Sequence, residues 1–165
     1  MIRTNNISFS YTEYEKTDEL DSEDMDLVIA ARQAASYAYA PYSKFKVGAA
    51  LKLESGMIVV GANVENAAFP SGICAERSAL SNSVSNRPAD KPVALAIASM
   101  TEDGLTEDFP SPCGSCRQVI AEEEFRTGNK IRIILSGKKK TLIVEGINAL
   151  LPLQFNRNNL KIILP

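Results

Sequence analysis

The sequence predicts a single α/β domain in which helices cover a partly parallel sheet. Its 165 residues, 45% hydrophobic and 23% charged, have the size and balance of one globular domain with one core. The spacing of apolar residues predicts a helix, two strands, and then helices alternating with strands. No internal repeat, low-complexity run or linker divides this order.

The first regular element expected is a helix that begins at Ser22, where acidic residues follow in the first turn. It should end near Tyr39, because Pro41 disfavours helical geometry in the residue before it. Residues 1–21 show no clear periodicity, so we expect an N-terminal extension, extended or flexible, ahead of a single domain over residues 22–165.

The next elements expected are a β-hairpin, a helix and a buried strand. Two apolar-rich segments, Lys46–Leu53 and Met57–Asn63, flank Glu54-Ser55-Gly56, which is a turn signal. The apolar spacing over Cys74–Ser85 suits a helix. Val93–Ser99 is a short continuous apolar run of the kind found in buried strands.

The last third of the chain continues the alternation of helices and strands. A loop with two prolines comes first, over Thr101–Pro112. The elements expected after it are a helix over Cys113–Glu124, strands over Ile131–Leu135 and Leu142–Val144, a helical turn over Ile147–Leu151, and a final strand or terminal extension over Leu160–Leu164.

Charge and hydropathy argue against nucleic acid and membrane as partners. Eighteen basic residues stand against 20 acidic ones, so polynucleotide binding has little electrostatic support. The run Lys138-Lys139-Lys140 is expected to be a solvated turn. No apolar stretch approaches the roughly 20 residues of a membrane span, and residues 1–20 lack the apolar centre of a secretion signal. A cytoplasmic setting is the expectation.

Histidine is absent, which excludes Ser-His and Cys-His catalysis and any histidine general base. Three cysteines, Cys74, Cys113 and Cys116, remain as candidate metal ligands. Cys113 and Cys116 are three apart in an expected helix, so both can face one ion. Cys74 lies at an expected helix start, where thiol pKa values fall.

The number of cysteines indicates the kind of site. An odd number without secretory features argues against a disulfide framework. Three protein ligands are typical of a catalytic zinc site, in which the fourth coordination position is left for water. The alternative, that the cysteines are small buried packing residues, suits a lone cysteine better than this trio, which has Glu76 and Pro112 beside it.

Four sequence blocks, in order along the chain, resemble the small homotetrameric cytidine deaminases. They are APYSKFKVGAA from Ala40, NVENA from Asn63, GICAER from Gly72 and SPCGSCRQV from Ser111. Leu150-Leu151-Pro152 and a following Phe155 agree as well. The resemblance implies a three-layer α/β/α sandwich with a mixed, partly parallel five-stranded sheet, and hydrolysis of cytidine and deoxycytidine with Zn²⁺ as cofactor. It also implies a cytoplasmic homotetramer.

The resemblance assigns a role to each residue that matches the family's motifs. The metal ligands would be Cys74, Cys113 and Cys116, and the proton shuttle would be Glu76. The substrate contacts would be Phe45 on the pyrimidine ring, Asn63 and Glu65 on the sugar 3′-hydroxyl, the Ala75 backbone N–H on the base carbonyl, and Phe155 as a lid over a neighbouring subunit's site. Phe69 departs from the family, in which tyrosine is common at that position.

Arg77 is expected to support the metal. Three thiolates on Zn²⁺ leave a formal charge of −1, which opposes ionisation of water, so something positive must offset it. Helix N-termini supply part of this. In similar proteins the arginine at the position of Arg77 hydrogen-bonds the cysteine sulfurs. Arg117 is a second candidate.

Other functions stay open at this stage. The same zinc chemistry could act on an aminopyrimidine nucleoside antibiotic such as blasticidin S, or on a free base, although Asn63 and Glu65 favour a sugar-bearing substrate. A purely structural zinc would need a closed fourth position and would leave Glu76 without a role. Action on RNA or DNA would need the basic clusters that the chain lacks.

Overall fold

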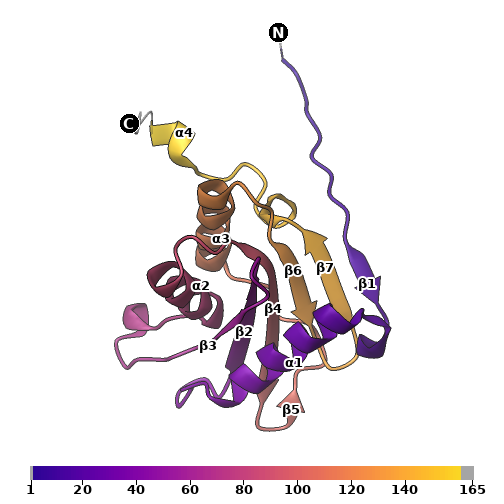
Figure 1. Ribbon diagram of the computed structural model, residues 1–165, viewed down its shortest axis with the longest axis vertical. Coiled ribbons are helices and arrows are strands. Elements are labelled where there is room, and N and C mark those ends of the chain that lie inside the picture. Colours follow the sequence, from indigo (N-terminus) through magenta and orange to yellow (C-terminus); the bar gives the residue numbers. More distant parts are fainter. Residues whose placement is uncertain (1, 161–165) are drawn as a thin grey trace.

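The computed structural model describes residues 2–160 and contains one mixed sheet flanked by helices (Figure 1). Its strands are β1 Thr12–Tyr14, β2 Lys46–Leu53, β3 Ile58–Ala62, β4 Pro92–Thr101, β5 Gly104–Leu105, β6 Arg132–Ser136 and β7 Thr141–Glu145. Its helices are α1 Ser22–Ser36, α2 Ala75–Asn86, α3 Gly114–Thr127 and α4 Arg157–Leu160, with short 3₁₀ turns η1 Thr17–Glu19, η2 Phe69–Ser71 and η3 Ile147–Ala149.

The sheet order is β1-β7-β6-β4-β2-β3, with β5 paired to β4. β4 and β6 run parallel, and the other described pairs are antiparallel. The prediction of a mixed, partly parallel sheet is therefore confirmed. The predicted count of five strands is wrong, because the sheet has seven. The two additional strands, β1 and β5, have three and two residues, too few to produce a detectable alternation.

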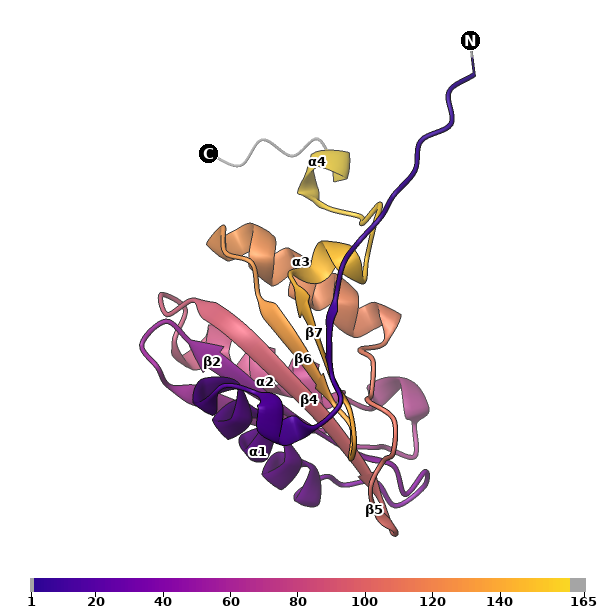
Figure 2. The same cartoon turned by 90° about the vertical axis from the view of Figure 1, so that its right-hand side faces the viewer.

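Alternation along the strands separates two apolar layers. Leu95 and Ile97 of β4 lie in the layer shared with α2 and α3. Ala94, Ala96 and Ala98 of the same strand lie in the layer shared with α1. α1 and α3 accordingly lie on opposite faces of the sheet (Figure 2), which confirms the three-layer sandwich.

Two glycines let helices lie directly on strands. A Cβ on Gly48 of β2 would overlap backbone atoms of Ala31 and Ala35 in α1. A Cβ on Gly61 of β3 would overlap the backbone of Ala75 and lie 2.5 Å from the Ala79 nitrogen in α2. The second approach fixes where α2 starts over the sheet, and thus where Cys74 lies.

The chain ends differ from expectation in detail. The first helix is capped by Asp21, whose carboxylate accepts a hydrogen bond from the Asp24 amide, and it ends at Ser36. Tyr39, expected near the helix end, instead forms a β-bridge with Val64. Residues 2–11 project away from the body of the molecule ahead of β1 (Figures 1 and 2). Of the element expected over Leu160–Leu164, only Leu160 is described, as the last residue of α4. Within the described part of the chain, no helix has the length and apolarity of a membrane span.

Candidate metal centre and pocket

Two helix starts bring the three cysteines together. Cys74 caps α2, Cys113 caps α3, and Cys116 lies in the first turn of α3. The Cys113 Sγ lies 4.0 Å from the Cys74 Sγ and 3.5 Å from the Cys116 Sγ, and all three sulfurs lie within 4.8 Å of one another. Because α2 and α3 lie on the same face of the sheet, residues 39 positions apart meet at one point.

The spacing of the sulfurs fits one zinc ion. Two sulfurs bound tetrahedrally at about 2.3 Å from Zn²⁺ lie about 3.8 Å apart. The two measured sulfur separations bracket this value. The chain has no histidine and no fourth cysteine to close the site. The donor set therefore matches a zinc centre with one open position.

The thiols differ in their readiness to ionise. Burial is the largest effect on Cys113 and opposes ionisation, but hydrogen bonds from the Cys116 and Ser115 amides and from the neighbouring thiols lower its pKa overall. Burial raises the pKa of Cys74 and of Cys116, the more buried of the two. A divalent cation is the charge that would hold these two as thiolates.

Glu76 lies in the first turn of α2, beside the sulfurs. Its side chain is buried, with 5% of the residue exposed, and burial raises the pKa of its carboxyl. Hydrogen bonds to its own backbone amide and to Cys116 partly offset that shift. A buried carboxyl with a raised pKa accepts a proton more readily than an exposed one, which suits a group that accepts and returns protons.

A cavity of about 480 Å³ opens onto the metal centre. Its walls combine the candidate site residues Phe45, Asn63, Glu65, Cys74, Ala75, Glu76 and Cys113. They also include Phe69, noted above only as a departure from the family, and residues to which the sequence assigned no role: Val47, Val64, Asn66, Gly72, Ile73, Ile97, Pro110 and Ser111. Ser111 lies inside one of the family-like blocks, and that position could have identified it as a site residue. The sequence around Ile97 indicates only a buried strand.

Asn63 and Glu65 are held by the backbone that leads into β2. Asn63 Oδ1 accepts a hydrogen bond from the Val47 amide at 2.7 Å, and its Nδ2 donates to the Phe45 carbonyl at 3.1 Å. Glu65 Oε2 accepts from the amides of Tyr42 at 2.9 Å and Ser43 at 3.3 Å. Both side chains thus line the cavity in fixed orientations.

The two arginines near the cysteines have different surroundings. Arg117 donates from Nε to the Pro112 carbonyl at 2.8 Å and from Nη1 to the Leu150 carbonyl at 2.7 Å, so it fixes the loop before Cys113. Arg77 is half-buried, and within residues 2–160 it forms no hydrogen bond with a cysteine sulfur. Its expected role at the metal stays a prediction.

Phe155 lies outside the cavity. Its side chain is 58% exposed, and its carbonyl accepts a hydrogen bond from Gln118 Nε2 at 2.8 Å. The structure therefore does not bring Phe155 to this chain's own pocket. A lid over a neighbouring subunit's site stays a prediction.

Comparison with known proteins gives matches along most of the chain. The family model described as "Cytidine and deoxycytidylate deaminase zinc-binding region" matches residues 21–128. A cytidine deaminase of Sporosarcina psychrophila is 40% identical over 134 residues, which cover 81% of this chain and 92% of that protein. A blasticidin-S deaminase of Bacillus cereus is 29% identical over 145 residues, which cover 87% and 99%. The crystal structure of cytidine deaminase from Burkholderia pseudomallei aligns with a TM-score of 0.67 and 34% identity over 79% of this chain and 97% of that one.

Proposed function

The chain belongs to the cytidine and deoxycytidylate deaminase family, and from this premise we propose that it hydrolyses cytidine and deoxycytidine to uridine and deoxyuridine, releasing ammonia. One observation carries the proposal: the three cysteine sulfurs lie together, and two of these cysteines, Cys74 and Cys113, line a cavity large enough for a nucleoside with the buried Glu76. This arrangement supports a metal and a proton shuttle that act at the same reaction centre.

Cys74, Cys113 and Cys116 would hold the metal. Zn²⁺ bound there supplies a hydroxide nucleophile at neutral pH, since it lowers the pKa of water from 15.7 to about 7. The helix N-termini at Cys74 and Cys113 place backbone amides and positive dipole ends near the thiolates.

Glu76 moves the protons of the reaction. It takes one proton from the attacking water and delivers it to the ring nitrogen N3, while oxygen adds to C4. It then takes the second proton of that oxygen and gives it to the amino group, which leaves as ammonia. Burial keeps water away from this carboxyl, so each proton stays between Glu76 and the substrate.

Four residues of the cavity wall would orient the nucleoside. Asn63 and Glu65 are the hydrogen-bonding pair for the sugar 3′-hydroxyl. Phe45 packs against the pyrimidine ring, and the Ala75 backbone N–H donates to the base carbonyl. A pair of polar groups reserved for the sugar favours a nucleoside over a free base.

We propose that the working form is a homotetramer in the cytoplasm. The support for assembly is that Phe155 and Leu153, which follow the family-like Leu150-Leu151-Pro152, are 58% and 91% exposed in the single chain. A neighbouring subunit would cover them. Metal binding by three thiolates agrees with a reducing compartment.

A nucleoside antibiotic is the second candidate substrate. The likeness to a blasticidin-S deaminase extends over 99% of that protein, and both reactions replace an amino group on a pyrimidine ring. The two substrates share the metal, Glu76 and the ring contact, so only turnover separates them.

The test is ultraviolet detection of the conversion of cytidine, deoxycytidine and blasticidin S by purified protein. Glu76→Gln, matched to the wild type in zinc content, is the paired variant. Turnover of cytidine or deoxycytidine by the wild type with a loss of at least about 1,000-fold in the variant supports the proposal. Zinc-loaded wild type that converts only blasticidin S would move the assignment to the antibiotic, and no turnover of any of the three would refute it.

A further inference from the structure

The turn over residues 41–45 wraps around the carboxylate of Glu65. One carboxylate oxygen, Oε2, accepts hydrogen bonds from the successive amides of Tyr42 and Ser43. Lys44 completes the turn in the left-handed region, at φ 59°, which a residue with a side chain adopts at a cost of about 1–2 kcal/mol. The surrounding contacts must hold this turn in place.

The Ser43 hydroxyl is the contact that joins the two sides of the turn. Ser43 Oγ accepts a hydrogen bond from the Phe45 amide at 3.0 Å. The Ser43 amide donates to Glu65 Oε2 at 3.3 Å, and interaction with the Ser43 side chain, together with the Tyr42 and Ser43 amides, lowers the pKa of the Glu65 carboxyl, a shift that slight desolvation opposes. Ser43 therefore links Glu65, the proposed sugar contact, to Phe45, the proposed contact of the pyrimidine ring.

We propose that Ser43 is a positioning residue that sets the orientation of Glu65 and Phe45 in the substrate pocket. This inference rests on the proposed nucleoside substrate. Because Oε2 is occupied by the turn, the other oxygen of Glu65 is the one free to accept the sugar hydroxyl. Ser43 itself touches no substrate, and its effect passes through Glu65.

A positioning role and a purely structural role predict different relative activities on two nucleosides. Deoxycytidine and 2′,3′-dideoxycytidine differ only in the 3′-hydroxyl that Glu65 would bind. Loss of the Ser43 hydroxyl should therefore impair the first nucleoside more than the second. A general loss of stability would impair both equally.

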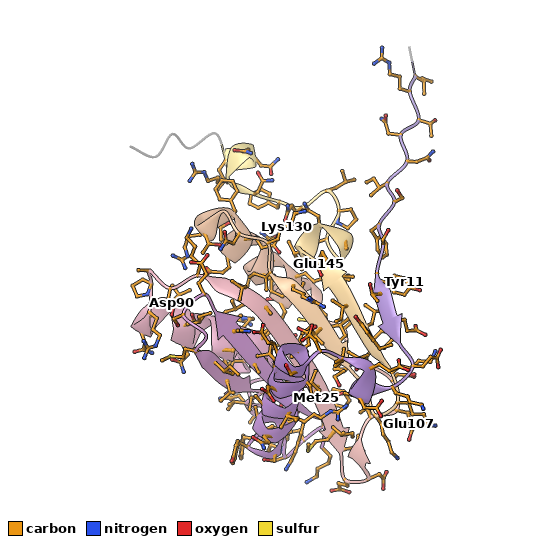
Figure 3. The ribbon with its side chains drawn as sticks, turned by 45° about the vertical axis from the view of Figure 1, so that its right-hand side comes forward. Tyr11, Met25, Asp90, Glu107, Lys130 and Glu145 are labelled. Atoms are coloured by element: carbon orange, nitrogen blue, oxygen red, sulfur yellow. The ribbon has the colours of Figure 1, made fainter. Side chains whose placement is uncertain are left out.

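The chain offers a matched control at Ser55, in the turn between β2 and β3. Ser55 Oγ also accepts from the amide two residues ahead, that of Met57 at 3.3 Å, and bonds a carboxylate, that of Asp90. Asp90 is labelled in Figure 3, and neither it nor Ser55 lines the substrate cavity. Ser55→Ala removes a comparable hydroxyl, one that also accepts from the amide two residues ahead and faces a carboxylate, away from the site.

The experiment compares kcat/KM for the two nucleosides in wild type, Ser43→Ala, Ser43→Thr and Ser55→Ala, all zinc-matched. We expect Ser43→Ala to lower kcat/KM for deoxycytidine about five- to tenfold, mainly through KM, and for dideoxycytidine less than about twofold. Ser43→Thr, which keeps the hydroxyl, should recover most of the loss, and Ser55→Ala should leave both values unchanged.

The outcomes separate the two proposals. An equal loss on both nucleosides, or no loss on either, in an otherwise active enzyme would overturn the role of Ser43 and leave the deaminase function intact. Zinc-loaded wild type that converts none of cytidine, deoxycytidine and blasticidin S would overturn the proposed function itself.

Discussion

The thiol of Cys74, at the start of α2, lies 4.0 Å from the thiol of Cys113, at the start of α3. Two separate helices therefore meet at the metal centre, and a metal ion would join them. We expect a chelator that removes zinc to lower the thermal midpoint, because an ion that binds only the folded chain stabilises it by RT ln(1 + L/Kd), where L is the free ion concentration. Differential scanning calorimetry with and without added Zn²⁺ measures this.

The matched variants are Cys116→Ser and Ser115→Ala. Loss of a ligand should weaken zinc binding more than about 100-fold, the upper range seen for loss of an outer contact. Ser115 is the exposed neighbour of Cys116 in the same turn, and its variant should keep one zinc per chain. Metal analysis after gel filtration distinguishes them. Full zinc in Cys116→Ser would exclude it as a ligand.

Gly48→Ala should destabilise the fold by at least about 3 kcal/mol. The new methyl group would overlap the backbone of α1 at Ala31 and Ala35, and backbone atoms cannot rotate away as a side chain can. Gly114→Ala is the control, since no atom lies within 4 Å of a Cβ there. Urea unfolding of both variants measures the difference. Equal urea midpoints for the two variants would mean that the backbone of α1 is not in close contact with β2 at Gly48.

Glu124 connects α3 to two segments across the fold. Its Oε1 accepts hydrogen bonds from the amides of Ile131 at 2.8 Å and Ile147 at 2.9 Å. Glu124→Ala would leave both donors without this acceptor and should cost about 2–4 kcal/mol. The exposed Glu122 on the same helix is the control, and Glu122→Ala should change the free energy of unfolding by less than about 0.5 kcal/mol.

Glu124→Gln keeps the accepting oxygen and removes the charge. Burial raises the pKa of Glu124 in the folded chain, so the folded state binds the proton more tightly than the unfolded state does. Wild-type stability should therefore fall, relative to Glu124→Gln, as the pH rises from the ordinary glutamate pKa of 4.5 through the raised value. A difference in unfolding free energy that moves the opposite way with pH would contradict this.

Local spacing made parts of the fold and site predictable. That Cys113 and Cys116 can face one ion follows from helix geometry alone, and the continuous apolar run over Val93–Ser99 indicated the buried strand β4. The pairing of β1 with β7 was not predictable, because Thr12 meets Ile143 across the whole chain and three residues carry no pattern. The meeting of Cys74 with that pair was inferred from the number of cysteines and from the family resemblance, not from spacing.

The environment of Asn63 also depended on tertiary structure. The family resemblance predicted that Asn63 and Glu65 bind the same sugar hydroxyl, but not that backbone groups at the start of β2 and in the turn before it would hold both side chains. Such bonds join segments that come together only after β2 and β3 have paired. Sequence patterns therefore located these residues without showing what orients them.

Arg77→Ala should lower zinc affinity or activity about 10- to 100-fold while leaving the fold intact. The reason is charge: three thiolates and Zn²⁺ sum to −1, and Arg117 is already bonded to the carbonyls of Pro112 and Leu150. Arg87→Ala, at the exposed C-terminal end of the same helix, is the control. Zinc titration and turnover at wild-type levels in Arg77→Ala would rule out this role.

Phe155 supplies a test of assembly as well as of catalysis. If it completes a neighbouring subunit's site, a Phe155→Ala chain keeps a working Glu76 but leaves its neighbour's site incomplete. A Glu76→Gln chain has the opposite defect. Each variant alone should be impaired, and co-expression should create sites that combine Glu76 from one chain with Phe155 from the other.

When equal amounts of the two chains assort at random, about a quarter of the sites contain both Glu76 and a neighbouring Phe155. Activity should therefore recover to about a quarter of the wild-type value. Recovery should follow mixed oligomers, isolated with a different affinity tag on each chain, and should be absent when the two purified variants are combined without subunit exchange. If Phe155 served its own chain's site or only packed against the surface, the mixed oligomers would show no more than the average of the two parents.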